Sequence, residues 1–413
     1  MRTKFIQAAK SPHRKCALHS LVLLGLAASA TAPDKSSANG FLLPNQDPEA
    51  IARGDAFAAT ADNPSAIYYN PAGITQLSGE NIRVGLYMIS PGVKYTSPDG
   101  ATAKANSDFQ PVPQVYATCS LPNTPISLGL GIYVPYGLSI NWGDNAPFNT
   151  IAQSGNLTYV TINPVVAWRV CQTLSVAIGP TINYSQASFK QAFFYSPLAP
   201  LGQFSVKGDG TDLGFNAGIL WQPHPMVSFG INYRSPTSIV YSGNSEFSPV
   251  APSTSTTATI KFPQYVVGGV SFRPTTNWNV EVDVNWTDWD TEKQIVFNNT
   301  SFGDLALPLD FKSSFTYDFG VTRQLGKGYF ASVGYIYSQN SSPDQNFTPL
   351  IPDANLQLGG IGFGHHGQRW DWAVGYQFAF NAGRTVSGNA NPLADGTYRI
   401  FNNAFNVATT YKF

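Results

Sequence analysis

The chain has 413 residues, with 24 basic and 24 acidic side chains, and only 12% of its residues are charged. Soluble domains carry about 25% charged residues, so this composition argues against a soluble globular domain, and the lack of a basic excess argues against nucleic acid as a partner. Thirteen per cent aromatic residues and 37 glycines instead suit β-strands that turn one face toward lipid.

The first thirty residues have the pattern of a secretion signal. Five basic residues precede an apolar run over residues 17–28, and Ala28-Ser29-Ala30 offers a small-residue cleavage site. Ser36-Ser37-Ala38 is an alternative cleavage site. The apolar run is too short to span a membrane, and Cys16 precedes it, which disfavours a lipid-modified N-terminus. Removing residues 1–30 leaves 19 basic and 24 acidic residues, a formal charge of −5, and we predict an exported protein.

Residues 31–80 contain the one long segment that does not show the pattern of β-structure. Asn63-Pro64 and Asn70-Pro71 each place a capping side chain before a proline, which is a signal for the start of a helix. The apolar residues of this segment are too few to bury one another. We therefore predict a compact plug of short helices that depends on walls supplied by the rest of the chain.

Alternation dominates residues 81–413. Between residues 278 and 286, tryptophan and valine alternate with asparagine, glutamate and aspartate, which places the two sets on opposite faces of a strand. Short connections alternate with long polar ones, as in an antiparallel barrel. We predict an all-β membrane protein, a transmembrane antiparallel barrel of about 14 strands with the helical plug in its lumen. The expected strands lie near residues 82–95, 112–121, 126–136, 157–170, 173–187, 212–222, 226–241, 262–274, 277–289, 313–325, 328–338, 355–364, 369–381 and 398–413. The expected long loops are 137–156, 188–211, 242–261, 290–312 and 339–354.

Tryptophans and the C-terminus both indicate a membrane. Seven tryptophans fall at or near the ends of expected strands, where aromatic rings form interfacial girdles: Trp168, Trp221, Trp278, Trp286, Trp289, Trp370 and Trp372. The chain ends in Phe413, on one strand face with Phe405, Val407 and Tyr411. This ending resembles the signal by which bacterial outer-membrane barrels reach their assembly machinery, although Thr409 departs from it. Expected partners are therefore that machinery, outer-membrane lipids and lipopolysaccharide.

Several motifs resemble the FadL-type long-chain fatty acid transporters of bacterial outer membranes. They are Gly40-Phe41, the segment Asn70-Pro71-Ala72-Gly73-Ile74 before the first strand, residues 133–138, residues 284–289, and a loop with two Pro-Asp pairs after residue 341. The resemblance implies a hatch inside the barrel, an apolar pocket and passive uptake of hydrophobic molecules. It also implies a gating role for Asn70, Pro71, Ala72 and Phe41. Relatives in this family take up aromatic hydrocarbons instead, so fatty acids and aromatic compounds both remain candidate substrates.

Pro135 and Gly137 predict a lateral opening in the wall. A hydrophobic molecule is not stabilised inside a water-filled pore. We therefore expect a route by which it leaves laterally, through the barrel wall into the bilayer. Pro135 falls in the third expected strand, where it cannot donate a ladder hydrogen bond, and Gly137 suits a kink or bulge. We expect the plug to cover the resulting gap, with Asn70-Pro71-Ala72 near the kink.

A ligand carboxylate needs a cation, and two residues are candidates. Arg234 is out of phase with the apolar face of its strand, and Lys190 lies at the far end of the fifth strand, so both are expected on the lumen face. The alternative is that each pairs with a lumen acid such as Glu281 or Asp283 as part of the barrel filling.

The sequence offers little for catalysis. After the leader, the histidines are His224, His365 and His366, all in expected turns with no partnered nucleophile or third metal ligand. We expect no enzyme activity, no metal and no cofactor. A general porin is the remaining rival, although it would have a charge-rich lumen and no apolar plug. Whether Cys119 and Cys171 pair is open.

Overall fold

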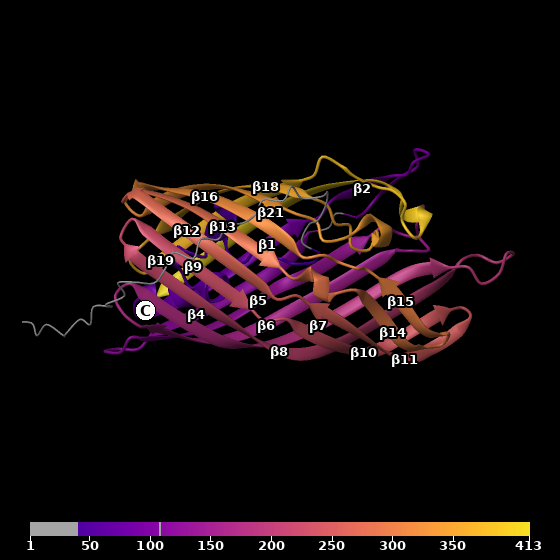
Figure 1. The fold of residues 1–413 in the computed structure, drawn as a ribbon, viewed down its shortest axis with the longest axis horizontal. Helices are drawn as coiled ribbons and strands as arrows, with labels where there is room; N and C mark the ends of the chain where they lie inside the picture. The colour runs from indigo at the N-terminus through magenta and orange to yellow at the C-terminus, as the bar shows by residue number, and fades with distance from the viewer. Residues whose placement is uncertain (1–39, 107–108) are drawn as a thin grey trace, which may run out of the picture.

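Fourteen strands close into an antiparallel barrel in the computed structural model, which describes residues 40–106 and 109–413 (Figure 1). The predicted leader and both candidate cleavage sites lie outside the described residues. The last wall strand pairs with the first, so the sheet has no free edge there. Around the wall the strands are β1 (Glu80–Ser90), β4 (Gln110–Ser120), β5 (Ile126–Asn141), β6 (Ser154–Arg169), β7 (Leu174–Phe193), β8 (Gly202–His224), β9 (Val227–Arg234), β12 (Tyr265–Thr275), β13 (Trp278–Thr287), β16 (Ser314–Gly326), β17 (Tyr329–Ser338), β18 (Leu356–His366), β19 (Trp370–Phe380) and β21 (Gly396–Lys412).

The predicted number of wall strands is confirmed, but three expected long loops are largely strand. Strands β7 and β8 continue as one hairpin far past the wall, and further hairpins are β10 (Thr237–Ser248) with β11 (Ala251–Phe262), and β14 (Gln294–Thr300) with β15 (Gly303–Pro308). Short strands β2 (Val93–Thr96), β3 (Thr102–Lys104) and β20 (Arg384–Val386) extend the sheet around β21. In β11 a run of serine and threonine over residues 253–257 occupies both faces, so the apolar–polar alternation that marks a strand is weak there.

The two ends of the barrel differ. Short connections and the C-terminus lie at one end, here called the turn end, and the long hairpins project from the other, the loop end (Figure 1). This arrangement agrees with the expected alternation of short and long connections. Three short 3-10 helices lie in the loop-end connections: η2 (Trp289–Thr291), η3 (Asp344–Asn346) and η4 (Pro392–Ala394).

The wall is apolar outside and polar inside. On β13, Val280, Val282 and Val284 are exposed, whereas Glu281 and Asp283 are buried in the lumen. A soluble barrel would show the opposite order, so the outer surface is one that lipid covers. Trp168, Trp221, Trp278, Trp370 and Trp372 are exposed at or near strand ends.

No helix within residues 40–106 and 109–413 is long and apolar enough to cross a membrane. Within the described residues both α-helices lie in the plug: α1 (Pro48–Ala52) and α2 (Ala66–Tyr69), and the 3-10 helix η1 (Pro71–Gln76) follows them. Asn70 caps η1 by accepting a hydrogen bond from the Ala72 amide at 3.2 Å. Such short helices are not stable alone, and the barrel wall surrounds them.

Glycines in the wall allow the plug backbone to touch it. A Cβ atom at Gly230 would collide with the backbone of Ala58, and one at Gly334 would collide with the backbone of Arg53 and Gly54. Because only glycine leaves this space, plug and wall pack main chain against main chain at these points.

Candidate functional site: an apolar cavity and a gap in the wall

An apolar cavity lies in the loop-end half of the barrel. Its lining comes from β5, β6, β7, β8, β10, β11, β14, β15 and the connection between β17 and β18, and apart from Asn156, Ser188 and Lys207 the side chains are almost all apolar. They include Phe41, Leu138, Leu157, Phe189, Tyr241, Ile260, Ile295, Phe297, Leu350 and Ile351. Such a concave, water-poor space suits an apolar ligand.

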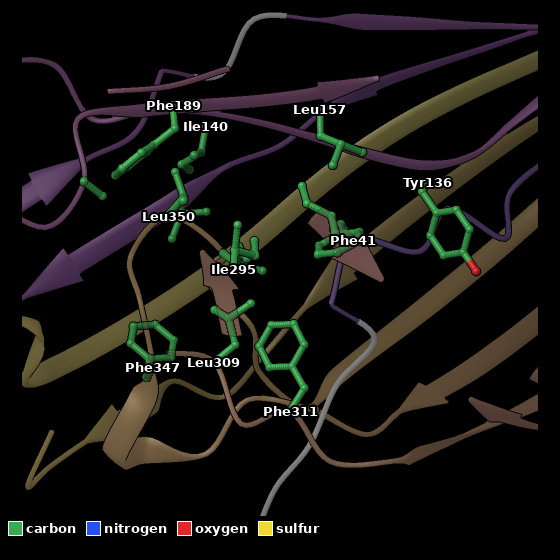
Figure 2. Packing of buried hydrophobic residues seen from close by; sticks show 14 of the residues in the cluster. Phe41, Tyr136, Ile140, Leu157, Phe189, Ile295, Leu309, Phe311, Phe347 and Leu350 are labelled. Carbon is green, nitrogen blue, oxygen red and sulfur yellow. The ribbon is translucent and has the colours of Figure 1, made fainter. Parts of the chain in front are cut away.

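Phe41 is buried beside this cavity and is 4% exposed. Its ring packs edge-on against Trp289, with the ring centroids 4.8 Å apart, and against Phe262 at 5.5 Å and Tyr136 at 6.3 Å. Figure 2 shows Phe41 within the same cluster as Leu157 and Tyr136. Each aromatic pair contributes about 0.5–1.5 kcal/mol beyond simple burial, so Phe41 is firmly held.

Trp289 corrects the prediction that all seven tryptophans lie in interfacial girdles. It is fully buried, and its ring packs between Phe41 and Phe311. Odd-numbered residues of β13 face the lumen, and Trp289 follows that parity into helix η2. The signal that could have placed it inside is its odd number, because Trp278 and Trp286, on the outer face, are even.

The wall has a gap between β4 and β5. Their ladder runs from Ser120↔Ser127 only as far as Val115↔Ile132, although β4 pairs with β1 along its whole length. At the loop end, β5 pairs with β6 through a register shift between Tyr133 and Tyr136. A second cavity lies at this gap and is lined by Phe41, Leu43, Pro113, Val134 and Gly137 among others.

Prolines on both facing strands keep the gap open. Pro135 lies within the bulge of β5, as its sequence position suggested. Pro111 and Pro113 lie on the outer half of β4, and our sequence analysis did not single them out. Two prolines alternating within one strand are a signal of an edge strand, because neither can donate a hydrogen bond to a neighbour.

Residues 40–46, here called the strap, cover the gap from inside. The Leu43 amide donates to the Pro135 carbonyl at 2.8 Å, and the Gly137 amide donates to the Phe41 carbonyl at 2.9 Å. The Gln46 side chain donates to the Val134 carbonyl at 2.8 Å. The strap therefore pairs with β5 where β4 does not, and it satisfies backbone groups that lipid could not.

Asn70 fastens the remainder of the plug, residues 47–76, here called the plug body. Its side-chain amide donates to the Ala58 carbonyl at 2.7 Å and to the Ile219 carbonyl of β8 at 3.0 Å. Pro71 packs beside Gly218, and both Asn70 and Ala72 are fully buried. These residues contact β8, so the expectation that they lie near Pro135 and Gly137 is wrong. The segment in contact with Pro135 and Gly137 is the strap.

Buried charges hold the plug body to the wall. Arg83 of β1 forms salt bridges with Asp47 and with Glu49, the latter at 3.0 Å, and Nε2 of His366 on β18 lies 3.0 Å from Glu49. The predicted lumen acids Glu281 and Asp283 also bind the plug body. Glu281 lies 3.6 Å from Arg53 and accepts a hydrogen bond from the Ala59 amide at 2.7 Å. Asp283 accepts from two plug amides at 2.8 Å each, those of Phe57 and Ala58.

The pKa values of Glu49 and Asp55 in the plug are shifted in opposite directions. Burial alone would raise the pKa of Glu49, but Arg83 and His366 outweigh burial and lower it to about 2. Burial raises the pKa of Asp55 to about 7, although Asp55 accepts a hydrogen bond from Tyr69 and nearby Asp47 adds to the rise. Glu49 is therefore ionised in its salt bridges, whereas Asp55 changes charge near neutral pH.

The two predicted cations lie on opposite sides of the wall. Arg234 is buried in the lumen, but neither Glu281 nor Asp283 pairs with it, because the plug occupies both acids. Lys190 is exposed, because even-numbered residues of β7 face outward while Phe189 faces the lumen. The expectation that Lys190 faces the lumen is therefore wrong, and the reason is strand parity.

The described residues contain no group of three histidine, cysteine, aspartate or glutamate side chains that could hold a metal ion. Cys119 and Cys171 are not disulfide-bonded to each other.

Comparison with known proteins gives a consistent result. A family model described as outer membrane protein transport protein (OMPP1/FadL/TodX) matches residues 29–412. The long-chain fatty acid transport protein of Salmonella typhi is 24% identical over 392 residues, covering 85% of this chain and 89% of the relative. The protein of the same name from Escherichia coli K12 is 23% identical over 404 residues, covering 85% and 90%.

Solved structures share the fold. A Pseudomonas aeruginosa FadL homologue superposes with a TM-score of 0.81 at 16% identity, covering 91% of this chain and all of the homologue. The Pseudomonas putida toluene transporter TodX superposes with a TM-score of 0.70 at 16% identity, covering 91% and 98%.

Proposed function

The chain belongs to the OMPP1/FadL/TodX family of outer membrane transport proteins, and from this we propose that it carries long-chain fatty acids passively through the bacterial outer membrane. A ligand enters from the loop end, occupies the apolar cavity beside Phe41, and leaves sideways through the gap between β4 and β5. The plug acts as the hatch, with the strap as its moving part and Asn70, Pro71 and Ala72 as its hinge on β8.

The apolar cavity supports the binding step. Transfer of an alkyl chain from water into this cavity favours binding by about 0.8 kcal/mol for each buried methylene group. Phe41 already occupies one side of this cavity, so a ligand can compete with it for the same contacts. A ligand that displaces Phe41 would also pull on the main chain of the strap.

One observation carries the proposal: the residue beside the cavity is the residue that closes the gap. The Phe41 side chain lines both cavities, and the Phe41 carbonyl accepts the hydrogen bond from Gly137 in the open part of the wall. Displacing the side chain therefore weakens the seal. Only a difference in ligand affinity between the two positions of the strap can drive this movement.

Aromatic hydrocarbons are the second candidate ligands. The apolar cavity has almost no polar lining, with Lys207 as its single charged lining residue, and a neutral ring needs no charged partner. The solved toluene transporter TodX has a similar fold. A general porin fits less well, because the plug fills the turn-end half of the lumen.

The proposal is tested by closing the gap. Replacing Pro111, Pro113 and Pro135 together with valine supplies three missing amide donors, so β4 and β5 can pair further toward the loop end. Cells with this variant should take up oleate at least tenfold more slowly than wild type, while the purified protein still binds oleate.

The matched control is Pro180→Val, which changes an exposed proline of β7 away from the gap and should leave uptake unchanged. Heat-dependent gel mobility would show that both barrels are assembled. Wild-type uptake by an assembled triple variant would exclude exit through this part of the wall.

A further inference from the structure

Three basic side chains lie side by side on the outer face of the barrel, at its loop end (Figure 1). In the sheet register, Lys94 of β2 lies directly opposite Arg399 of β21 on one side and Lys104 of β3 on the other. All three are exposed, whereas Val93 and Tyr95, the sequence neighbours of Lys94, are buried in the interior. The three cations therefore point away from the lumen, and they are here called the basic row.

No carboxylate of the described chain compensates the charge of the basic row. Within residues 40–106 and 109–413, none of its three cations forms a salt bridge. The next outward positions toward the hairpin tips are the threonines Thr96, Thr102 and Thr397. Directly opposed side chains have Cβ atoms about 4.5–5.5 Å apart, and like charges placed in this way destabilise a sheet. An anion bound across the row would remove this repulsion.

Lys190, another outward cation of the loop end, differs from the basic row because an acid shares its face. Lys190 of β7 lies opposite Ser205 of β8, and Ser205 lies opposite Glu246 of β10. Lys190 and Glu246 are both exposed. The surface around Lys190 therefore carries both signs of charge, whereas the basic row carries one.

The basic row lies where the apolar outer face of β21 ends. The outward residues of this strand run from Tyr411 at the turn end through Phe405 to Phe401, and Arg399 is the next outward position. Tyr411 and Phe401 are ten residues apart, which corresponds to about 33 Å along the strand. At a tilt of about 40° this distance gives a height of about 25 Å, the thickness of the apolar band of an outer-membrane barrel. Because the long loops of such barrels are extracellular, the basic row lies at the head-group level of the outer leaflet.

We propose that the basic row binds the phosphate groups of lipopolysaccharide, whose acyl chains then pack against Phe401 and Phe405. Arg399 can present two parallel donors to one phosphate, and Lys94 and Lys104 add point charges. Each basic residue near an anionic membrane surface strengthens binding by about fivefold. This site lies on the outer face of the wall, outside the apolar cavity, so the inference does not depend on which molecule the protein transports.

The test compares two lipids that differ only in their phosphates. Purified wild-type protein in detergent should bind lipid A, the phosphorylated lipid part of lipopolysaccharide, at least tenfold more tightly than dephosphorylated lipid A. The triple variant Lys94→Gln, Lys104→Gln and Arg399→Gln should lose at least tenfold in affinity for lipid A and keep its affinity for the dephosphorylated lipid within about twofold. Lys94→Gln alone, at the centre of the row, should lose about fivefold. Added salt should weaken lipid A binding by wild type more than by the triple variant.

The matched control is Lys190→Gln, Lys261→Gln and Lys312→Gln, which removes the same charge from exposed loop-end lysines that do not face one another in the sheet register. It should bind lipid A like wild type, and heat-dependent gel mobility shows that each barrel is assembled. Equal loss of affinity in the control, or wild-type affinity in the assembled triple variant, would overturn the site. Displacement of lipid A by inorganic phosphate, but not by sodium chloride of the same ionic strength, would also overturn it, because free phosphate would then be the ligand.

Discussion

The two parts of the plug are attached to the barrel by different kinds of contact. The strap is held by backbone hydrogen bonds to β5 and by aromatic packing around Phe41, next to two cavities. The plug body is held by buried salt bridges and by the side chain of Asn70, and it packs directly on wall glycines.

This difference shows how one small domain can both seal and open a barrel. Contacts with an apolar ligand can replace the aromatic and apolar contacts of the strap with little net change in free energy, because both kinds of contact bury apolar surface. A buried salt bridge cannot be exchanged in this way, since separating it leaves a charge without a partner. We therefore expect the strap to respond to ligand while the plug body stays in place.

The largest effect should come from removing the main anchor of the plug body. Arg83→Met leaves the buried carboxylates of Asp47 and Glu49 without their arginine, which typically costs about 3–5 kcal/mol. Hydrogen exchange of the plug amides should accelerate, and single-channel recordings should show ion conductance that wild type lacks. Arg323→Met, a change at an exposed arginine of β16, should do neither. Equal loss of protection in the wall strands would mean that plug and barrel do not separate.

A smaller effect is expected at the hinge. Asn70→Ala leaves the carbonyls of Ala58 and Ile219 without their donor, and an unsatisfied buried polar group costs about 1–3 kcal/mol. Fatty acid uptake by cells should fall severalfold while the barrel stays resistant to detergent before heating. Asn381→Ala removes a comparable bond, from a residue directly after β19 to the Tyr398 carbonyl of β21, and serves as the control. Unchanged uptake would show that Asn70 only caps a helix.

Truncating the Phe41 side chain in the strap should strengthen ligand binding. If Phe41 competes with ligand for the apolar cavity, Phe41→Ala should tighten oleate binding about tenfold, or about 1.4 kcal/mol. Phe311→Ala removes the same volume from the same cluster without lining the cavity, and it should not tighten binding. Weaker oleate binding to Phe41→Ala would make Phe41 part of the site wall instead of its competitor.

The smallest effect is expected from Asp55→Asn. This variant should change uptake, measured at a single pH, by less than about twofold. The pKa of Asp55 is raised from 3.8 to about 7, so the folded state binds this proton more tightly than the unfolded state. Its contribution to stability is therefore full below about pH 4 and is lost as the pH rises through 7. Hydrogen exchange of the plug should accelerate over that range in wild type and much less in Asp55→Asn. Asp62→Asn, at an exposed plug residue, should behave like wild type.

Sequence alone determined the barrel and the presence of a plug. The period of two in a strand, the turn residues and the cap at Asn70 are local features that act within a few residues of one another. The predicted cap at Asn63 is wrong, because α2 begins after Ser65 and Asn63 binds the Ser65 amide in the turn before it. The apolar faces of β13 and β19 point outward as their alternation predicted. Pro135 likewise marked the irregular strand, because proline lacks a donor wherever it lies.

Tertiary structure decided what the plug touches and which charges remain unpaired. Asp283 binds amides 225 and 226 residues away in sequence, and this left Arg234 without the acid that its strand position had suggested. The faces on which Lys190 and Trp289 lie follow from the parity of β7 and β13, outward for Lys190 and inward for Trp289. A shift of one residue reverses the face of every side chain beyond it, so the site arises from register and long-range packing, which local sequence patterns do not specify.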